Sequence, residues 1–254
     1  MYKNVTADEY KRYFNLENEY KIDGFIVYGA WDIEKYTQEM LQGVLGQGIE
    51  FSAQKLSSFL SDITEVTIGG KKYWFSVCYG SAKLSEYAHL ACLFGARWML
   101  HIGSTGALSK DIHALDIIIP TLSVSDDSVA KLYRSGYENS DLKNHLYSYF
   151  AKQNASVHRG VCLSIQAMMG ETLDDIIQWD KEGYSCVDLE SSTLMHVANY
   201  FKVPSASILY VSENLAHEET VLTASYEEQK HARSQIKRTI FNAVSEIIKN
   251  PPAW

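Results

Sequence analysis

Residues 205–213 read Ser-Ala-Ser-Ile-Leu-Tyr-Val-Ser-Glu, and this stretch decides the fold class. Its first part, 205–211, is a short continuous apolar run, which is typical of a strand buried on both faces of a sheet. Helices are predicted before and after it along the chain, at residues 190–201 and at about 226–249. A buried strand between two helices indicates an α/β fold.

The same alternation of strands and helices extends toward the N-terminus. Gly69-Gly70 separates two alternating runs and predicts a β-hairpin. Residues 1–20 are predicted to be a helical lead-in, and Thr172–Asp175 has the form of a capping box that starts a helix. The other predicted strands are 24–28, 63–68, 71–77, 98–102, 115–120, 157–165 and 186–189, and the other predicted helices are 32–45, 83–94, 140–152 and 172–182. This order predicts a three-layer α/β/α fold with a mixed, largely parallel, twisted central sheet.

Length and composition favour a single domain over residues 1–254, because no Pro/Gly/Ser-rich linker divides the 254 residues. The formal net charge of −8 lowers the expectation of a nucleic-acid partner, which needs a dense basic face. Four cysteines without paired spacing predict free thiols and no zinc site. The chain begins without an apolar signal segment and has no run long enough to span a bilayer, so we expect a cytoplasmic protein without a membrane partner.

Polar residues follow the predicted strands directly, and in an open α/β sheet this is where ligands bind. Together they could bring carboxylates and hydroxyls into one cleft. These residues are Asp32, Glu34, Ser104, Glu190, Ser212 and Glu213.

Two separated motifs carry a resemblance to a known family. Residues 187–192 read Val-Asp-Leu-Glu-Ser-Ser and are followed by a helix, by Val203-Pro204 and by the strand that ends in Ser212-Glu213. Residues 101–108 read His-Ile-Gly-Ser-Thr-Gly-Ala-Leu, a strand-ending Gly-Ser-x-Gly loop. In this order and spacing they resemble the nucleoside phosphorylase and nucleosidase family. The resemblance implies that family's fold, a nucleoside substrate, no metal or organic cofactor, and a homodimer or higher homo-oligomer.

The family has a branch that attacks the ribose C1′ with phosphate and a branch that attacks it with water. The phosphate branch holds phosphate with arginines, but this sequence has Ile33 and His101 at the two places, and only Arg12 precedes Arg97. Arginine suits phosphate because its planar fork donates two bonds at once. Residues 29–34 (Gly-Ala-Trp-Asp-Ile-Glu) instead resemble the first loop of the methylthioadenosine/S-adenosylhomocysteine nucleosidase branch.

The resemblance implies roles for single residues. Glu34 falls on the base that activates water, Ser104 on a contact to water or sugar, and Glu190 on the carboxylate that holds the ribose hydroxyls. Glu213 falls on the acid, or on the residue that orients the acid, where the family usually has aspartate. The remaining expected substrate contacts, some of which line the pocket for the base, are His101, Gly103, Gln166, Ala167, Met168, Asp188, Leu189 and Ser212.

The sequence thus predicts a nucleosidase that hydrolyses the N-glycosidic bond of a nucleoside, with a purine as the expected base. A phosphorylase with an atypical phosphate site built on His101 is one alternative. A nucleoside-binding protein that has lost catalysis is another, because Glu213 is one methylene longer than aspartate. Each site residue also has a structural alternative: Glu34 and Glu213 as solvated acids, Ser104 in a turn, and His101 and Met168 as core residues.

Overall fold

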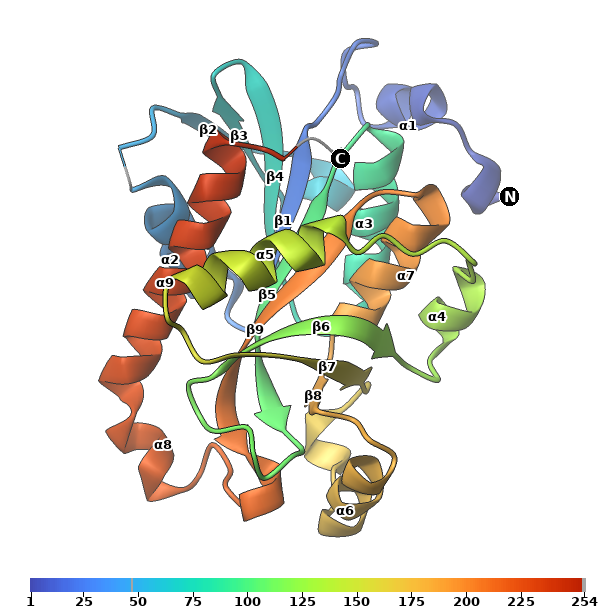
Figure 1. The fold of residues 1–254 in the computed structure, drawn as a ribbon. Coiled ribbons are helices and arrows are strands. Elements are labelled where there is room, and N and C mark those ends of the chain that lie inside the picture. The colour runs from blue at the N-terminus through green and yellow to red at the C-terminus, as the bar shows by residue number, and fades with distance from the viewer. Residues whose placement is uncertain (47, 253–254) are drawn as a thin grey trace.

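The computed structural model describes residues 1–46 and 48–252, which form a single nine-stranded sheet flanked by helices (Figure 1). The strands are β1 (Gly24–Gly29), β2 (Ser52–Lys55), β3 (Thr64–Ile68), β4 (Lys71–Cys78), β5 (Met99–Ala107), β6 (Ile117–Val124), β7 (Val157–Ser164), β8 (Cys186–Asp188) and β9 (Ser205–Asn214). The α-helices are α1 (Ala7–Tyr13), α2 (Ile33–Leu45), α3 (Ser81–Leu93), α4 (Ser128–Leu132), α5 (Asp141–Lys152), α6 (Leu173–Lys181), α7 (Ser191–Phe201), α8 (Ala224–Glu228) and α9 (Lys230–Lys249). Short 3₁₀ turns lie at Tyr2–Asn4, Ser58–Leu60, Met168–Gly170 and Leu215–His217.

The sheet is mixed and its centre is parallel. β1 pairs in parallel with β4 and β5, β5 with β9, and β7 with β6 and β8. The pairs β2–β3, β3–β4, β5–β8 and β6–β9 are antiparallel. Because β5 contacts β8 on one side and also pairs with β9, the strands β5, β8, β7, β6 and β9 close into a ring at one end of the sheet. The predicted α/β class with a mixed, largely parallel sheet is confirmed.

Helices cover both faces of the sheet (Figure 1). α2 packs against α9 on one face, and α3 packs against α7 on the other, while α5 crosses β6, β7 and β9. Successive residues of β1 point to opposite faces: Ile26 belongs to the buried cluster under α2 and α9, whereas Phe25 and Val27 belong to the cluster under α3 and α7. β1 is therefore apolar on both sides, as expected for a strand in a sheet buried on both faces.

Local turn and cap signals are confirmed in detail. Gly69 and Gly70 connect β3 to β4 and both have positive φ, at 55° and 78°, as the tight hairpin turn requires. Thr172 Oγ1 accepts a 3.2 Å bond from the Asp175 amide, and the Asp175 carboxylate accepts a 3.0 Å bond from the Thr172 amide. This reciprocal pair is the predicted capping box.

The structure differs from the predicted elements at four places. Gly103–Gly106 is not a loop, because β5 continues through it to Ala107; a Cβ on Gly106 would lie 2.5 Å from Leu215 Cδ1, so this glycine permits close packing rather than a turn. β2 was not predicted, since all four of its residues are exposed and show no apolar alternation. The lead-in is only partly helical, and the predicted final helix is divided at Gln229 into α8 and α9.

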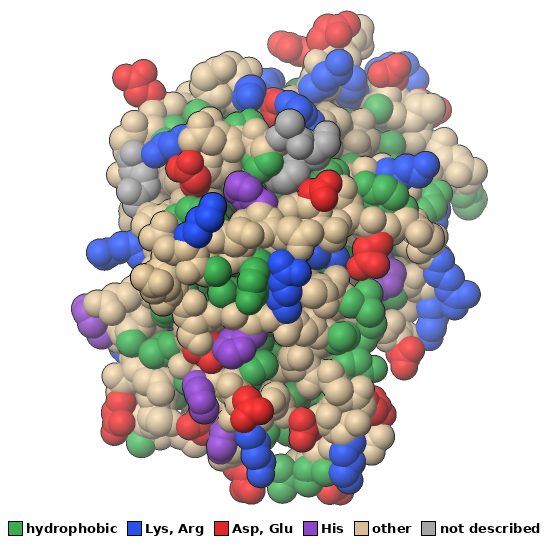
Figure 2. All heavy atoms as spheres, viewed as in Figure 1, with side chains coloured by type: hydrophobic (Ala, Val, Ile, Leu, Met, Phe, Trp, Pro, Cys, Tyr) green, Lys and Arg blue, Asp and Glu red, His purple; other side chains and the backbone are tan. Residues whose placement is uncertain are grey.

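Figure 2 shows Lys and Arg side chains interspersed with Asp and Glu over the face viewed. The four cysteines are free thiols, as predicted. Within 1–46 and 48–252, no helix combines the length and apolarity needed to cross a bilayer.

Candidate functional site

Glu190 lies at the N-terminus of α7, directly after β8, and its side chain is almost fully buried. Its Oε1 accepts a 2.6 Å hydrogen bond from the backbone N–H of Gly80, at the end of β4. Gly80 has a φ of 80°, which a side chain would disfavour, and it begins α3. Two segments far apart in the sequence therefore fix one carboxylate at the edge of the sheet.

His101, in the middle of the sheet on β5, lies beside this carboxylate. Its ring is fully buried, and its Nε2 lies 3.8 Å from Glu190 Oε2. A Cβ on Gly29 would lie 2.7 Å from His101 Nε2 and 2.8 Å from Glu190 Oε2, and a Cβ on Gly103 would lie 2.8 Å from the same nitrogen. Glycine at 29 and 103 is thus required by the close approach of the histidine.

The opposite edge of the His101 ring faces a network of serines and an aspartate. Nδ1 lies 3.2 Å from Ser191 Oγ and from Ser207 Oγ, and 3.8 Å from Asp188 Oδ2. Asp188 Oδ1 accepts a 2.6 Å bond from Ser164 Oγ, and Asp188 Oδ2 accepts bonds from the amide and the hydroxyl of Ser191. Both Asp188 oxygens are therefore used inside the protein, and the residue organises the site from behind.

Burial sets the charge of this cluster. It lowers the pKa of His101 to about 4, against the opposing effect of Asp188. Burial, followed by the charge of Asp188, raises the pKa of Glu190 to about 8, although the Gly80 amide opposes the rise. The empty site therefore holds a neutral imidazole beside a protonated carboxyl at pH 7.

Glu213 lies on β9, opposite Gly106 of β5, and is half-buried. Its Oε2 is buried without a hydrogen-bond partner among the described residues, and so is Arg233 Nη1 on α9. Burial raises the pKa of Glu213, while a bond from Ser212 and the charge of Arg233 lower it. A buried acid oxygen without a partner is suited to receive a ligand atom.

The other predicted residues lie at strand ends around these groups. Glu34 is exposed in the first turn of α2, where it lines a shallow hollow with Asp32 and the outer face of that helix. Ser104 is exposed, whereas the other residues of β5 are buried. It lies opposite Tyr210 of β9. Leu189 and Ser212 are buried beside Glu190 and Glu213 in the chain.

The segment after β7, predicted to contact the base, is tied to two helices. Ser81 Oγ donates a 2.7 Å bond to Gln166 Oε1, and Gln166 Nε2 donates a 2.7 Å bond to Asp127 Oδ2. Ala167 is exposed and Met168 half-buried, in the 3₁₀ turn that follows. The loop is therefore held at its start and open at its tip.

His101, Asp188 and Glu190 also lie close enough together to be considered as metal ligands. However, Asp188 faces Nδ1 of the ring and Glu190 faces Nε2, on opposite edges. Both Asp188 oxygens already accept hydrogen bonds from Ser164 and Ser191, and these bonds would have to be given up for Asp188 to bind an ion.

The comparisons with known proteins agree with this arrangement. A family model described as the phosphorylase superfamily matches residues 66–249. The chain belongs to the phosphorylase superfamily. The resemblance seen in the motifs is confirmed, and with it an enzyme that acts on nucleosides by hydrolysis or phosphorolysis.

Several relatives of this superfamily resemble the chain. It is 25% identical over 175 residues to the DeoD-type purine nucleoside phosphorylase of Bacillus thuringiensis (strain Al Hakam), a match that covers 66% of this chain and 69% of that protein. Uridine phosphorylase from Vibrio fischeri ES114 superposes with a TM-score of 0.72 at 19% identity, covering 91% of this chain and 95% of the other. The 5′-methylthioadenosine/S-adenosylhomocysteine nucleosidase of Helicobacter pylori superposes with a TM-score of 0.67 at 18% identity, covering 89% and 98%. The two structures show the shared superfamily fold.

Some residues of this superfamily member's site were not found from the sequence. No role was predicted for Gly80, whose bond to Glu190 spans the sheet. Glu171, after the 3₁₀ turn, has a pKa raised to about 7, first by burial and then by the charges of Glu213 and Asp175. Arg233 lies on a helix predicted only as a packing element. No local pattern marks them, since their partners are distant in the chain.

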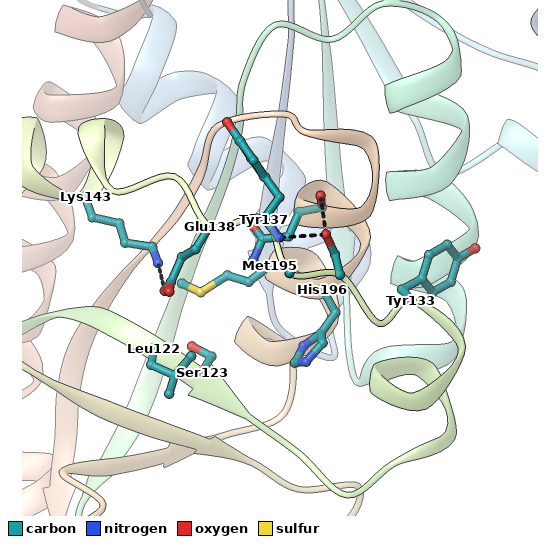
Figure 3. Close-up of a pocket in the computed structure, with 11 residues that line it drawn as sticks. Leu122, Ser123, Tyr133, Tyr137, Glu138, Lys143, Met195 and His196 are labelled. Carbon is teal, nitrogen blue, oxygen red and sulfur yellow. Dashed lines mark hydrogen bonds and ion pairs between the residues drawn. The ribbon is translucent and has the colours of Figure 1, made fainter.

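A second cavity of about 160 Å³ lies between the end of β6, α7 and the segment before α5 (Figure 3). Lys143 is almost buried beside it and donates to Thr121 O and Glu138. Its lining contains none of the predicted site residues; it is Leu122, Ser123, Tyr133, Ser135, Gly136, Tyr137, Glu138, Lys143, Met195, His196 and Asn199. The cavity is thus separate from the cluster around Glu190.

Proposed function

We propose that this protein is a nucleosidase, which uses water to hydrolyse the N-glycosidic bond of a purine nucleoside. The choice of water over phosphate rests on one observation: His101, at the place where phosphate-using relatives are expected to have arginine, is fully buried and uncharged near neutral pH. A phosphate dianion needs charged or converging donors. Here it would meet a neutral imidazole whose Nε2 already faces Glu190.

The first loop supports the same choice. Asp32 caps α2, where its side chain accepts a 3.1 Å bond from the Lys35 amide, and Glu34 follows in the first turn. The N-terminus of a helix would otherwise attract an anion. Two carboxylates at this end disfavour phosphate and supply a base for water.

Hydrolysis would divide the work among residues on different strands. Glu34 takes a proton from the attacking water, and Ser104 contacts water or sugar. Glu190 holds the ribose hydroxyls as C1′ gains positive charge. Acid and base groups of this kind each contribute about 10²–10⁴-fold to a rate.

Glu213 is the proposed acid for the leaving base. Its raised pKa keeps a larger fraction of the carboxyl protonated, and its buried Oε2 has no partner among the described residues. A purine presents N7 as an acceptor for such a proton. The similarity to a purine nucleoside phosphorylase supports a purine as the base.

The deciding experiment is release of free base from a panel of purine and pyrimidine nucleosides, including 5′-thio-substituted adenosines, with and without inorganic phosphate. Release that is unchanged by phosphate supports the nucleosidase. Release that requires phosphate and yields ribose 1-phosphate identifies a phosphorylase. Binding of a nucleoside without any release identifies a binding protein that has lost catalysis.

A further inference from the structure

Nε2 of His101 is buried without a hydrogen-bond partner among the described residues, and it has no role in the hydrolytic scheme above. Its ring lies at the centre of the sheet, Nδ1 toward Asp188 and Nε2 toward Glu190, each 3.8 Å away. A buried polar atom without a hydrogen bond costs free energy, so its retention beside a carboxyl needs a reason.

The hydrogen bonds assign the tautomer of the ring. Ser191 Oγ donates its single proton to Asp188 Oδ2 and can therefore only accept from His101 Nδ1. A proton on Nδ1 satisfies the contacts to both Ser191 and Ser207, whereas a bare Nδ1 could accept only from Ser207, so the contacts favour a neutral imidazole with its proton on Nδ1 and a lone pair on Nε2 facing Glu190. Asp188, behind the ring, would stabilise a second proton if the ring gained one.

We propose that His101 is the proton partner of Glu190: the pair holds one proton, which rests on Glu190 in the empty site and moves to His101 Nε2 when the two hydroxyls of a ribose bind the carboxylate. The O–H bond of Glu190 breaks, an N–H bond forms on the imidazole, and the net charge of the pair does not change. This inference rests on the proposed role of Glu190 as the ribose-binding residue.

The transfer is chemically reasonable because a vicinal diol offers two O–H donors, which bind a carboxylate better than a neutral acid. For the transfer, the distance between His101 Nε2 and Glu190 Oε2 must shorten from 3.8 Å to about 2.8 Å, the usual length of an N⁺–H···O⁻ bond. The backbone at Gly29 lies against both atoms and shields them from water. His101 is thus a positioning residue, which lets Glu190 be neutral in the absence of a ligand and charged when a ribose is bound.

Other titratable groups that face the pair do not compete for the proton. Burial raises the pKa of the Cys78 thiol to about 12, and burial with the charge of Glu190 raises the pKa of Tyr79, so both are neutral. Asp188 already accepts three hydrogen bonds from Ser164 and Ser191. Ser207 and Ser191 contribute hydroxyls only.

The first test is NMR of the ligand-free protein at pH 7, with ¹⁵N-labelled histidine and ¹³C-labelled glutamate carboxyls. The expected result is a protonated Nδ1, a bare Nε2 on His101 and a protonated Glu190. A protonated Nε2, or an ionised Glu190, in the empty site would overturn the proposal whether or not the protein is a nucleosidase.

The second test is adenosine affinity against pH in wild type, His101→Gln and His101→Asn. Wild-type affinity should be flat from about pH 5.5 to 7.5, because the pair keeps its proton on binding. The variants cannot accept it, so their affinity should rise about tenfold per pH unit over the same range. His145→Gln, an exposed histidine on α5, is the matched control and should keep the flat profile.

The two ideas fail in different ways. If the adenosine affinity of wild type rises with pH as steeply as that of His101→Gln, the proposed proton transfer is wrong. The proposal that the protein is a nucleosidase is then unaffected. Absence of nucleoside binding and cleavage contradicts the proposed function, and the ligand-free resonances then still decide whether Glu190 and His101 hold the proton as stated.

Discussion

The backbone amide of Gly80 donates a 2.6 Å hydrogen bond to Glu190 Oε1. This bond joins the end of β4 to the start of α7, and it leaves Glu190 Oε2 facing His101. One oxygen of the carboxyl thus anchors the side chain while the other is available for chemistry. The two oxygens can be tested separately.

Replacing Glu190 should weaken nucleoside binding and turnover together. Glu190→Ala removes the anchor and the ribose contact, and we expect kcat/KM to fall about 100-fold or more, since hydrogen bonds to charged groups are each worth about 1.5–3 kcal/mol. Glu190→Gln keeps an acceptor for Gly80 and should retain more binding. Steady-state kinetics on ribosides and 2′-deoxyribosides measure this, and equal wild-type activity on both would contradict a close contact to the 2′-hydroxyl.

Glu190 should also make stability depend on pH. Its pKa is about 8 in the folded protein, and a free glutamate titrates near 4.3. Between these values the folded state binds more protons than the unfolded state, so the free energy of unfolding should fall as pH rises through this window. Urea unfolding of wild type and Glu190→Gln at several pH values isolates the effect, which should reach a few kcal/mol. Parallel pH profiles for the two proteins would refute it.

Glu34→Gln should abolish hydrolysis while leaving nucleoside affinity nearly intact. The amide cannot take a proton from water, and loss of a general base costs about 10²–10⁴-fold in rate. Glu50→Gln is the control, since Glu50 is an exposed acid in the loop before β2. Turnover and binding are measured on the same preparations, and unchanged turnover in Glu34→Gln would remove this residue from the mechanism.

The length of the Glu213 side chain should matter as much as its acidity. Glu213→Gln should reduce release of purines, because it removes the proton donor. Glu213→Asp keeps the acid but withdraws it by about one methylene, and a misplacement of about 1 Å costs about 10²-fold. Faster turnover in Glu213→Asp would show instead that the glutamate had impaired an ancestral activity.

Gly29→Ala should disrupt the site from the backbone side. A Cβ there would lie 2.7 Å from His101 Nε2 and 2.8 Å from Glu190 Oε2, so one of them must move. We expect a large loss of kcat/KM with a lower melting temperature. Gly136→Ala is the matched control, because a Cβ at Gly136 meets no atom within 4 Å, and it should leave activity unchanged. Normal kinetics in Gly29→Ala would show that the His101–Glu190 approach is not needed.

Local chemistry made much of the fold predictable. The Gly69-Gly70 turn, the Thr172 capping box and the apolar strand at 205–211 each depend on near neighbours, and the structure has all three. Gly103 and Gly106 were wrongly assigned to a loop, because glycine there is required by packing rather than by a turn: the side chain of His101 approaches Gly103, and that of the distant Leu215 approaches Gly106.

The sequence indicated candidate site residues but not the contacts between them. The motif at 187–192 identified Glu190, but not its bond to Gly80 or the charge of its neighbour His101, which depend on burial. The charge of Arg233 acts on Glu213, and the charge of Glu213 acts on Glu171, through space, and these effects leave no pattern in the chain. The roles of the site residues, among them Glu34, Ser104, Glu190 and Glu213, stay predictions, as do the single domain, the homo-oligomer and the cytoplasmic location.

The ring of strands has a consequence for how the protein forms during synthesis. β5 carries His101 and Ser104, yet its parallel neighbour β9 begins only at Ser205, so the ring stays open until β9 has been made. Such long-range pairing is slow, because a large loop must be closed before any contact forms. A nascent chain that ends before β9 leaves one edge of β5 unpaired and lacks Ser212 and Glu213 of the candidate site. The candidate site can therefore be completed only after β9 has been synthesised.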